Sequence, residues 1–363
     1  MCYRSWAFRF SFRHSFRCCD SHEHCAIIGS RVYHLFCLRP QKTMPSIRPP
    51  HRTLLLTLDA FNTVFHPRLP VAVQYTQAAQ SLGFLPPTAS ADAVQSAFRS
   101  AFKHQSALRP NYGRQIPGFG GPKAWWGSVI RECMANVKGN GTREEDVPEE
   151  LVQSLIERFN GAEGYSLYPD AGGFFERLRK WKESKRRIRE DIEVRGNGKQ
   201  FDWIVVGILS NSDDRVASIL TSFGLRVGTA WADGGELLDI TGKQIPSDGH
   251  YDVDFIVTSY EAGHEKPHKG IFEVAEKRAR EHLLTTESDS HYPRFFREQT
   301  SWSYVHVGDD YEQDYQGAIN AGWDCYLLPR DDIGHSPEDL TGVRKINSLS
   351  ELLPQLGLED CPE

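Results

Sequence analysis

Short apolar runs alternate with stretches of helical spacing along most of the chain, and this pattern predicts an α/β fold. Residues 53–58 (TLLLTL) form an apolar run of buried-strand length that ends at Asp59. Strand-length runs return at 203–209, 255–259, 304–307 and 324–328. Apolar residues at three and four spacing predict helices at 171–182, 213–223, 269–282 and 311–321. The alternation predicts a doubly wound (Rossmann-like) parallel sheet.

A block of helices separates the first predicted strand from the others. Apolar residues with helical spacing predict four helices there, at 71–82, 91–105, 123–137 and 149–159. Gly and Pro breakers lie between them, and no strand candidate interrupts the block. We therefore expect an insertion over the carboxyl edge of the sheet. The predicted organisation is a helical domain at 67–165 within an α/β core formed by 51–66 and 166–363.

Residues 1–50, the basic head, differ from the rest in charge and cysteine content. They hold eight Lys or Arg against two acids, a net charge of +6, so the remainder of the −6 chain carries −12. Five of the eight Cys also lie here. The head is typical of a mitochondrial transit peptide; the alternatives are a gene-model extension without a fold ahead of Met44, and an ordered arm. A zinc site would need a second ligand pair beyond Cys18, Cys19, His22, His24 and Cys25.

Three polar stretches, at 183–200, 239–251 and 285–300, are expected to be surface excursions of the core. The first overlaps a basic run, Arg177–Arg189, with eight Lys or Arg and one acid. Such a run is typical of a nuclear-localisation or nucleic-acid patch or of a solvated helix end. The −12 charge of the body disfavours duplex DNA, because affinity for DNA comes from neutralising its phosphates. We therefore predict no nucleic-acid partner.

The distribution of apolar and cysteine residues also bears on the compartment. No apolar run approaches the roughly 18 to 20 residues that span a bilayer, so no membrane span is predicted. The three Cys beyond the head are scattered, which favours a reducing environment. The expected location is intracellular, in the cytoplasm or nucleus, or in the mitochondrion if the head is a transit peptide.

Four polar constellations each follow a predicted strand, where ligands bind in an open α/β sheet. They contain Asp59 and Thr63; Ser210 and Asn211; Lys266; and Asp309, Asp310 and Asp314. Taken singly, each has a structural explanation, such as a turn or a helix N-cap. Four of them in this order after four strands indicate one shared site.

The residue types in these constellations suit displacement at phosphorus or carbon. Asp59 is a carboxylate able to act as a nucleophile and to be released later by water. Lys266 can keep that carboxylate ionised and neutralise an anionic substrate, while Ser210 and nearby N–H groups can bind substrate oxygens. The three acids at 309, 310 and 314 are hard oxygen donors suited to Mg²⁺.

The order Asp59-x-x-x-Thr63, Ser210-Asn211, Lys266-Pro267, Gly308-Asp309-x-x-x-x-Asp314 resembles the four motifs of the haloacid dehalogenase-like (HAD) hydrolase superfamily, over residues 53 to about 330. The helical block resembles that superfamily's C1-type cap. The chain also resembles one subgroup, haloacid dehalogenase-like hydrolase domain-containing protein 3 and its fungal relatives. The resemblance lies in the motifs Asn111-Tyr112-Gly113, Trp125-Trp126 and Tyr168-Pro169-Asp170.

The resemblance implies a role for each matched residue. Asp59 would be the nucleophile that forms a covalent aspartyl intermediate, with Thr63 as its hydroxyl neighbour. Ser210, with Asn211 beside it, and Lys266 would bind the phosphate or leaving group. The implied Mg²⁺ would be held by Asp59, by the backbone carbonyl of Phe61 and principally by Asp309, with Asp310 or Asp314 in support.

Phe61 departs from the pattern of the superfamily's phosphatases, where a second Asp acts as general acid two residues after the nucleophile. General acid–base help is typically worth about 10²- to 10⁴-fold, so monoester hydrolysis is expected to be weak unless another group substitutes. Candidate substitutes are Asn62, His66, Tyr112 and Asp213. The true haloacid dehalogenases resemble the chain in carrying an aromatic here, but their fourth motif lacks the Gly-Asp-Asp pattern.

Three functions therefore stay open. The first is a Mg²⁺-dependent hydrolase of a small, anionic phosphorylated substrate. The second is a catalytically reduced protein that binds a ligand or partner through its cap, with Trp125 and Trp126 as contacts rather than core. The third is a metal-independent 2-haloacid dehalogenase.

Overall fold

The structure, a computed structural model, describes residues 51–190, 201–228, 251–285, 300–330 and 341–358. All of them belong to one compact unit, Pro49–Glu363. The predictions for the basic head, for residues 239–250 and for residues 286–299 lie outside the described residues. Every candidate site residue lies inside them.

The core is a parallel sheet, as predicted. Five of the described strands form one sheet in the order β5-β4-β1-β6-β7, and each neighbouring pair is parallel. β1 is central, with Leu55 in register with Val205 on one side and Tyr304 on the other. The strand bounds are Arg52–Leu58 for β1, Trp203–Ser210 for β4, Phe255–Thr258 for β5, Ser301–Gly308 for β6 and Asp324–Leu327 for β7.

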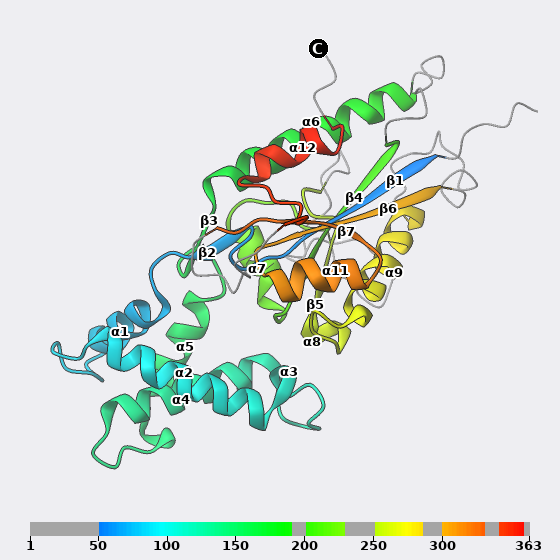
Figure 1. The fold of residues 1–363 in the computed structure, drawn as a ribbon. Coiled ribbons are helices and arrows are strands. Elements are labelled where there is room, and N and C mark those ends of the chain that lie inside the picture. Colours follow the sequence, from blue (N-terminus) through cyan, green and yellow to red (C-terminus); the bar gives the residue numbers. More distant parts are fainter. Residues whose placement is uncertain (1–50, 191–200, 229–250, 286–299, 331–340, 359–363) are drawn as a thin grey trace, which may run out of the picture. The chain divides into compact units, whose positions relative to one another are not determined.

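Helices cover both faces of this sheet. Successive β1 side chains point to opposite faces, so the strand contributes side chains to a core on each side. Leu54, Leu56 and Leu58 pack in the core shared with α6 (Pro169–Glu190), α7 (Arg215–Ser222) and α12 (Leu352–Gln355). Leu55 packs in the other core, which contains α9 (Lys269–Thr285) and α11 (Gly317–Asn320). Figure 1 shows α6 and α12 on one side of the sheet and α9 and α11 on the other.

Two short antiparallel strands pair where the chain enters and leaves the predicted insertion. They are β2 (Phe65–Pro67) and β3 (Tyr165–Leu167). Between the two strands the chain is helical, and we call residues 68–164 the helical insertion. Its elements are α1 (Val71–Ser81), α2 (Ala91–Leu108), α3 (Pro110–Gly113), α4 (Gly121–Lys138), a 3₁₀ turn (Glu144–Asp146) and α5 (Glu149–Arg158).

The helical insertion has its own buried side chains. Trp125, Ile130, Met134 and Leu151 are nearly or fully buried. The indole N–H of Trp125 lies 3.1 Å from the carbonyl of Arg109 and 3.3 Å from that of Gln105. For Trp125, the interpretation as a core residue therefore holds.

One predicted boundary is wrong. The stretch from residue 183 was expected to be a surface excursion, whereas α6 continues to Glu190. The Lys, Arg and Glu residues that suggested an excursion are also good helix formers. Part of the basic run is also bound to the core. The guanidinium of Arg179 donates to both carboxylate oxygens of Asp252, and Nζ of Lys182 lies 2.7 Å from Oδ2 of Asp254.

Smaller elements were not predicted. α8 (Ser259–Ala262) follows β5 directly, and a 3₁₀ turn (Leu349–Glu351) precedes α12. The helix expected at 311–321 is a wide turn at Tyr311–Gln316 followed by α11. No helix in the described ranges is long and apolar enough to cross a membrane. Cys133 and Cys325 are buried free thiols.

Candidate active site

The carboxyl ends of the central strands bring the predicted site residues to one edge of the sheet. Asp59 directly follows β1, Ser210 ends β4, and Asp309 directly follows β6. Lys266 comes from the loop between α8 and α9, and Asp314 from the wide turn after β6. Because β4, β1 and β6 are neighbours, residues up to 255 positions apart in sequence meet there.

One lysine bridges two of the carboxylates. Nζ of Lys266 lies 2.5 Å from Oδ1 of Asp59 and 2.5 Å from Oδ1 of Asp314, and it also donates to the carbonyl of Leu209 at 2.9 Å. All three charged side chains are buried. Burial would lower the pKa of Lys266, but the charges of Asp314 and Asp59 outweigh it and raise that pKa above its ordinary value. The lysine is therefore held cationic.

Both carboxylate oxygens of Asp314 are bound by groups of the protein. Its Oδ1 lies near Lys266 Nζ and 3.1 Å from Nε2 of the buried His306, and its Oδ2 accepts from the backbone N–H of Asp310 at 3.0 Å. Burial would raise its pKa, but Lys266 and then His306 bring the pKa well below its usual value. Gly308 makes room for this arrangement, because a Cβ there would overlap the Asp314 carboxylate. Asp314 is thus a fixed negative charge that orients Lys266.

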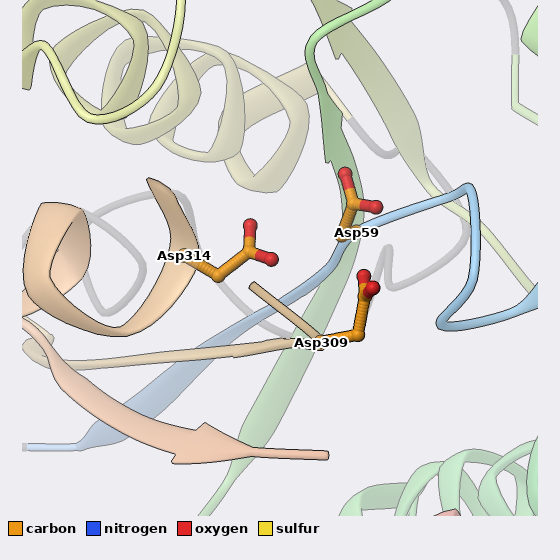
Figure 2. Close-up of side chains that lie close together, drawn as sticks. All are labelled: Asp59, Asp309 and Asp314. Atoms are coloured by element: carbon orange, nitrogen blue, oxygen red, sulfur yellow. The ribbon is translucent and has the colours of Figure 1, made fainter. Parts of the chain in front are cut away.

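Three carboxylates, those of Asp59, Asp309 and Asp314, face a common space, as Figure 2 shows. One oxygen of each lies within 4.8 Å of one oxygen of both others. Burial raises the pKa of Asp309 to about 7, and the charges of Asp59 and Asp314 add to this effect. Burial likewise raises the pKa of Asp59 to about 6, although Lys266 opposes it. The negative charge at this edge therefore exceeds what Lys266 neutralises.

This donor set fits a divalent cation that prefers hard oxygen ligands, such as Mg²⁺. Asp309 accepts a hydrogen bond from Thr63 at 3.2 Å, which orients one of its oxygens and leaves the other for a ligand. The carboxylate of Asp310 lies outside this cluster. Its Oδ1 accepts from the N–H groups of Glu312 and Gln313, so it caps the wide turn and is not one of the three clustered acids.

Asn211 has a positioning contact that its sequence motif did not reveal. Its Oδ1 accepts from the N–H of Lys266 at 2.6 Å, and its Nδ2 donates to the carbonyl of Lys266 at 2.9 Å. The amide therefore fixes the backbone from which the lysine side chain extends. Ser210, the preceding residue, is buried at the end of β4, beside β1.

Phe61 lies two residues after Asp59 in a tight turn, where Asn62 has a positive φ of 57°. Its ring packs edge-on against Phe65 at 4.8 Å and against Tyr165 at 5.6 Å. Phe61 thus packs with Phe65 and Tyr165, the first residues of β2 and β3, at the two ends of the helical insertion. An aromatic ring offers no proton at this position.

The structure also places the candidate substitutes for a general acid. Both oxygens of the buried Asp213 bind Arg215, at 2.8 Å from Nε and 2.9 Å from Nη2. The same carboxylate accepts from the indole N–H of Trp126 at 2.7 Å. His66 contacts the carbonyl of Pro67 at 2.9 Å. Burial raises the pKa of the Tyr112 phenol above its ordinary value, which makes it a weaker acid.

Two motif residues of the helical insertion, Asn111 and Trp126, are half-buried and make hydrogen bonds to the core. Nδ2 of Asn111 donates to the carbonyl of Ser259 at 2.7 Å, and Trp126 binds Asp213 as described. Asn111 and Tyr112 have positive φ angles of 46° and 57°, a conformation that costs of order 1–3 kcal/mol for such residues. These two contacts join the helical insertion to the loop after β4 and to the start of α8.

Comparisons with known proteins bear on the family of the chain. No family model matches the chain. The chain is similar to an uncharacterised protein of Saccharomyces cerevisiae, with 27% identity over 77% of this chain and 73% of that protein. It is also similar to haloacid dehalogenase-like hydrolase domain-containing protein 3 of Xenopus laevis, with 25% identity over 79% of this chain and 93% of that protein.

Among solved structures, a 2-haloacid dehalogenase of Pseudomonas syringae pv. Tomato DC3000 is similar with 17% identity, over 84% of this chain and 97% of that one, at a TM-score of 0.45. The sequence similarities span both the α/β core and the helical insertion. The chain therefore resembles the HAD-like hydrolase superfamily, and within it haloacid dehalogenase-like hydrolase domain-containing protein 3 and its fungal relatives.

Proposed function

We propose that this chain is a Mg²⁺-dependent hydrolase that acts on a small, anionic phosphorylated substrate through a covalent intermediate on Asp59. The observation that supports it most is the cluster of Asp59, Asp309 and Asp314 around a single buried lysine. Buried carboxylates with raised pKa values that gather around one cation are typical of functional sites. The three carboxylates and the ammonium of Lys266 carry a net charge of −2 when all are ionised, which a divalent cation would balance.

Asp59 is the nucleophile in this proposal. Lys266 binds its Oδ1, which leaves Oδ2 to attack phosphorus. Mg²⁺ would be held by Asp309, by the carbonyl of Phe61 and by Oδ1 of Asp59, whose second lone pair is free while the first accepts from Lys266, and it would neutralise charge on the phosphoryl oxygens. Ser210 and the N–H groups after β4 would bind the remaining phosphoryl oxygens. Water then cleaves the aspartyl phosphate and restores the carboxylate.

Phe61 is the observation that favours the other two candidates, a metal-independent 2-haloacid dehalogenase and a catalytically reduced binding protein. A halide leaves without a proton, so a dehalogenase needs no acid at this position. Against the dehalogenase stands the acidic pair Asp309 and Asp314, because a second and third carboxylate beside the nucleophile repel an anionic substrate unless a cation is present.

The full chain, assayed with a panel of phosphate compounds and with 2-haloacids, in Mg²⁺ or in EDTA, separates the three candidates. Our proposal predicts phosphate release that requires Mg²⁺ and disappears in Asp59→Asn. Halide release in EDTA would identify the dehalogenase instead. The absence of both products under all conditions would favour the binding protein.

Mg²⁺ is expected to raise the Tm of the full chain more at about pH 8 than at about pH 5. The folded-state pKa of Asp309 is raised from 3.8 to about 7, so the folded state binds more protons and loses stability as pH rises across that range. A cation offsets this charge above pH 7, whereas protons compete with it at pH 5. Thermal denaturation with and without Mg²⁺ measures the effect; Asp309→Asn should lose it, and an equal shift at both pH values would contradict it.

A further inference from the structure

Residues 59–64, which we call the nucleophile turn, carry most of the groups proposed to hold Mg²⁺. They supply the carboxylate of Asp59 and the carbonyl of Phe61. The hydroxyl of Thr63, on the same turn, donates to Asp309 at 3.2 Å. Thr63 is fully buried, so its own carbonyl also needs a hydrogen-bond partner within the protein. The spacing of the proposed metal ligands therefore depends on what holds this turn in place.

Arg330, on the segment after β7, supplies that partner. Its Nη2 donates to the carbonyl of Thr63 at 2.7 Å, and its Nε donates to the same oxygen at 3.2 Å. Its Nη1 donates to Oδ2 of Asp170, at the start of α6, at 2.9 Å. The Arg330 side chain is 9% exposed, so water competes little for these charge-assisted bonds. One planar guanidinium thus joins the nucleophile turn to α6.

The motif Tyr168-Pro169-Asp170, whose role the sequence left open, holds this arginine. The Arg330 guanidinium lies 4.1 Å from the centre of the Tyr168 ring, a cation–π distance. Oδ2 of the aspartate also accepts from the Ser348 hydroxyl at 2.9 Å and from the following backbone N–H at 2.8 Å. Burial would raise the pKa of Asp170, but its hydrogen bonds, that from Arg330 first, bring the pKa below its ordinary value. Arg330 therefore has a fixed anion beside it.

Arg330 also contacts both segments that connect the core with the helical insertion. The first segment runs from Thr63 into β2, and the second runs from β3 into α6. The two are paired beside the arginine, because the N–H of Tyr168 donates to the carbonyl of Val64 at 3.1 Å. The nucleophile turn is thus held by Arg330 from the core and by the paired strands β2 and β3 from the insertion.

We infer that Arg330 is a positioning residue for the metal site. It fixes the nucleophile turn so that the carbonyl of Phe61 and the carboxylate of Asp309 keep the spacing that one divalent cation needs. This inference rests on the proposed function. Mg²⁺ demands nearly ideal octahedral geometry, so a small displacement of one ligand weakens its binding. Loss of a group that orients metal ligands typically lowers metal affinity by about 10- to 100-fold.

Mn²⁺ gives a readout that needs no turnover, because it favours the same oxygen ligands as Mg²⁺ and the EPR signal of the free aqueous ion measures how much is bound. In the full chain, we expect Arg330→Gln to raise the Kd for Mn²⁺ by about 10- to 100-fold. Asp309→Asn removes a proposed ligand and is the reference for loss of the site. Arg344→Gln, the matched control, breaks an exposed pair with Asp324 and should leave the Kd unchanged.

A second variant separates positioning from folding. Arg330→Lys keeps the charge beside Asp170 but lacks the planar fork that reaches the carbonyl of Thr63 as well. We expect it to raise the Kd by about tenfold, the lower end of the same range. A residue that only stabilises the fold changes the Tm but not the Mn²⁺ affinity of the folded chain. Affinities are therefore compared at a temperature at which circular dichroism shows each variant to be folded.

The outcomes distinguish the inference from the proposed function. Weaker Mn²⁺ binding in both Arg330 variants, with Arg344→Gln unchanged, would support the inference. If the wild type binds Mn²⁺ through Asp309 and the folded Arg330 variants bind it with the same Kd, the inference is overturned and the proposed function stands. If Asp309→Asn binds Mn²⁺ as the wild type does, the chain has no metal site at this turn, and both are overturned.

Discussion

Phe61→Asp is expected to raise the rate of benzyl phosphate hydrolysis by about 10²- to 10⁴-fold, the usual contribution of a general acid. The substitution places a carboxyl group two residues from the nucleophile, on the turn that already carries Asp59. Partial burial near acidic neighbours favours the protonated form that can donate to an alkoxide. Initial rates with saturating Mg²⁺ measure the gain.

Phe61→Asn is the matched control, because it removes the same ring and adds a side chain of the same shape without an ionisable proton. Both variants lose the edge-on contacts with Phe65 and Tyr165, so their stabilities should be similar. If the Asp and Asn variants hydrolyse benzyl phosphate equally slowly, the missing acid is not what limits alkyl phosphates.

Lys266→Met is expected to lower the free energy of unfolding by about 3–5 kcal/mol, the usual cost of removing one partner from a buried ion pair. Lys266 is the cation between Asp59 and Asp314, and its removal leaves two buried carboxylates facing each other. Methionine fills a similar volume, so the loss reports charge rather than a cavity. Urea denaturation near neutral pH measures it.

The loss should also depend on pH. Without Lys266, the pKa of each carboxylate in the folded state rises, so the folded state binds more protons and loses stability as pH increases. Lys269→Met, at the exposed start of α9, is the control, because the side chain of Lys269 is 68% exposed and pairs with Glu273 in an i,i+4 arrangement. A Lys266 variant as stable as this control would contradict the role of Lys266 as the central cation.

The parallel sheet was predictable because each of its strands is a buried apolar run that stands out against polar flanks. The shared site followed from the same signal, since Asp59, Ser210 and Asp309 come at or just after strand ends. The ribbon of β2 and β3 could not be predicted, because strands of three residues are too short to show alternation.

Side-chain roles within loops were less accessible from sequence. Asp309 and Asp310 are adjacent and chemically equal, yet one joins the acidic cluster and the other caps a turn. Asn211 could be a ligand-binding residue or a backbone clamp, and only its contacts with Lys266 assign the second role. The pairing of Trp126 with Asp213 joins residues 87 positions apart, and no local pattern encodes it.

The central claim, that Asp59 becomes covalently phosphorylated, has one direct measurement. The full chain is mixed with Mg²⁺ and 4-nitrophenyl phosphate and quenched in acid, and peptides are analysed by mass spectrometry. Because Phe61 cannot activate water, we expect the aspartyl phosphate to persist, so the peptide containing Asp59 gains the mass of one phosphoryl group, and Asp59→Asn gains none. An unmodified Asp59 peptide, together with phosphate release that continues at the wild-type rate in Asp59→Asn, would contradict the claim.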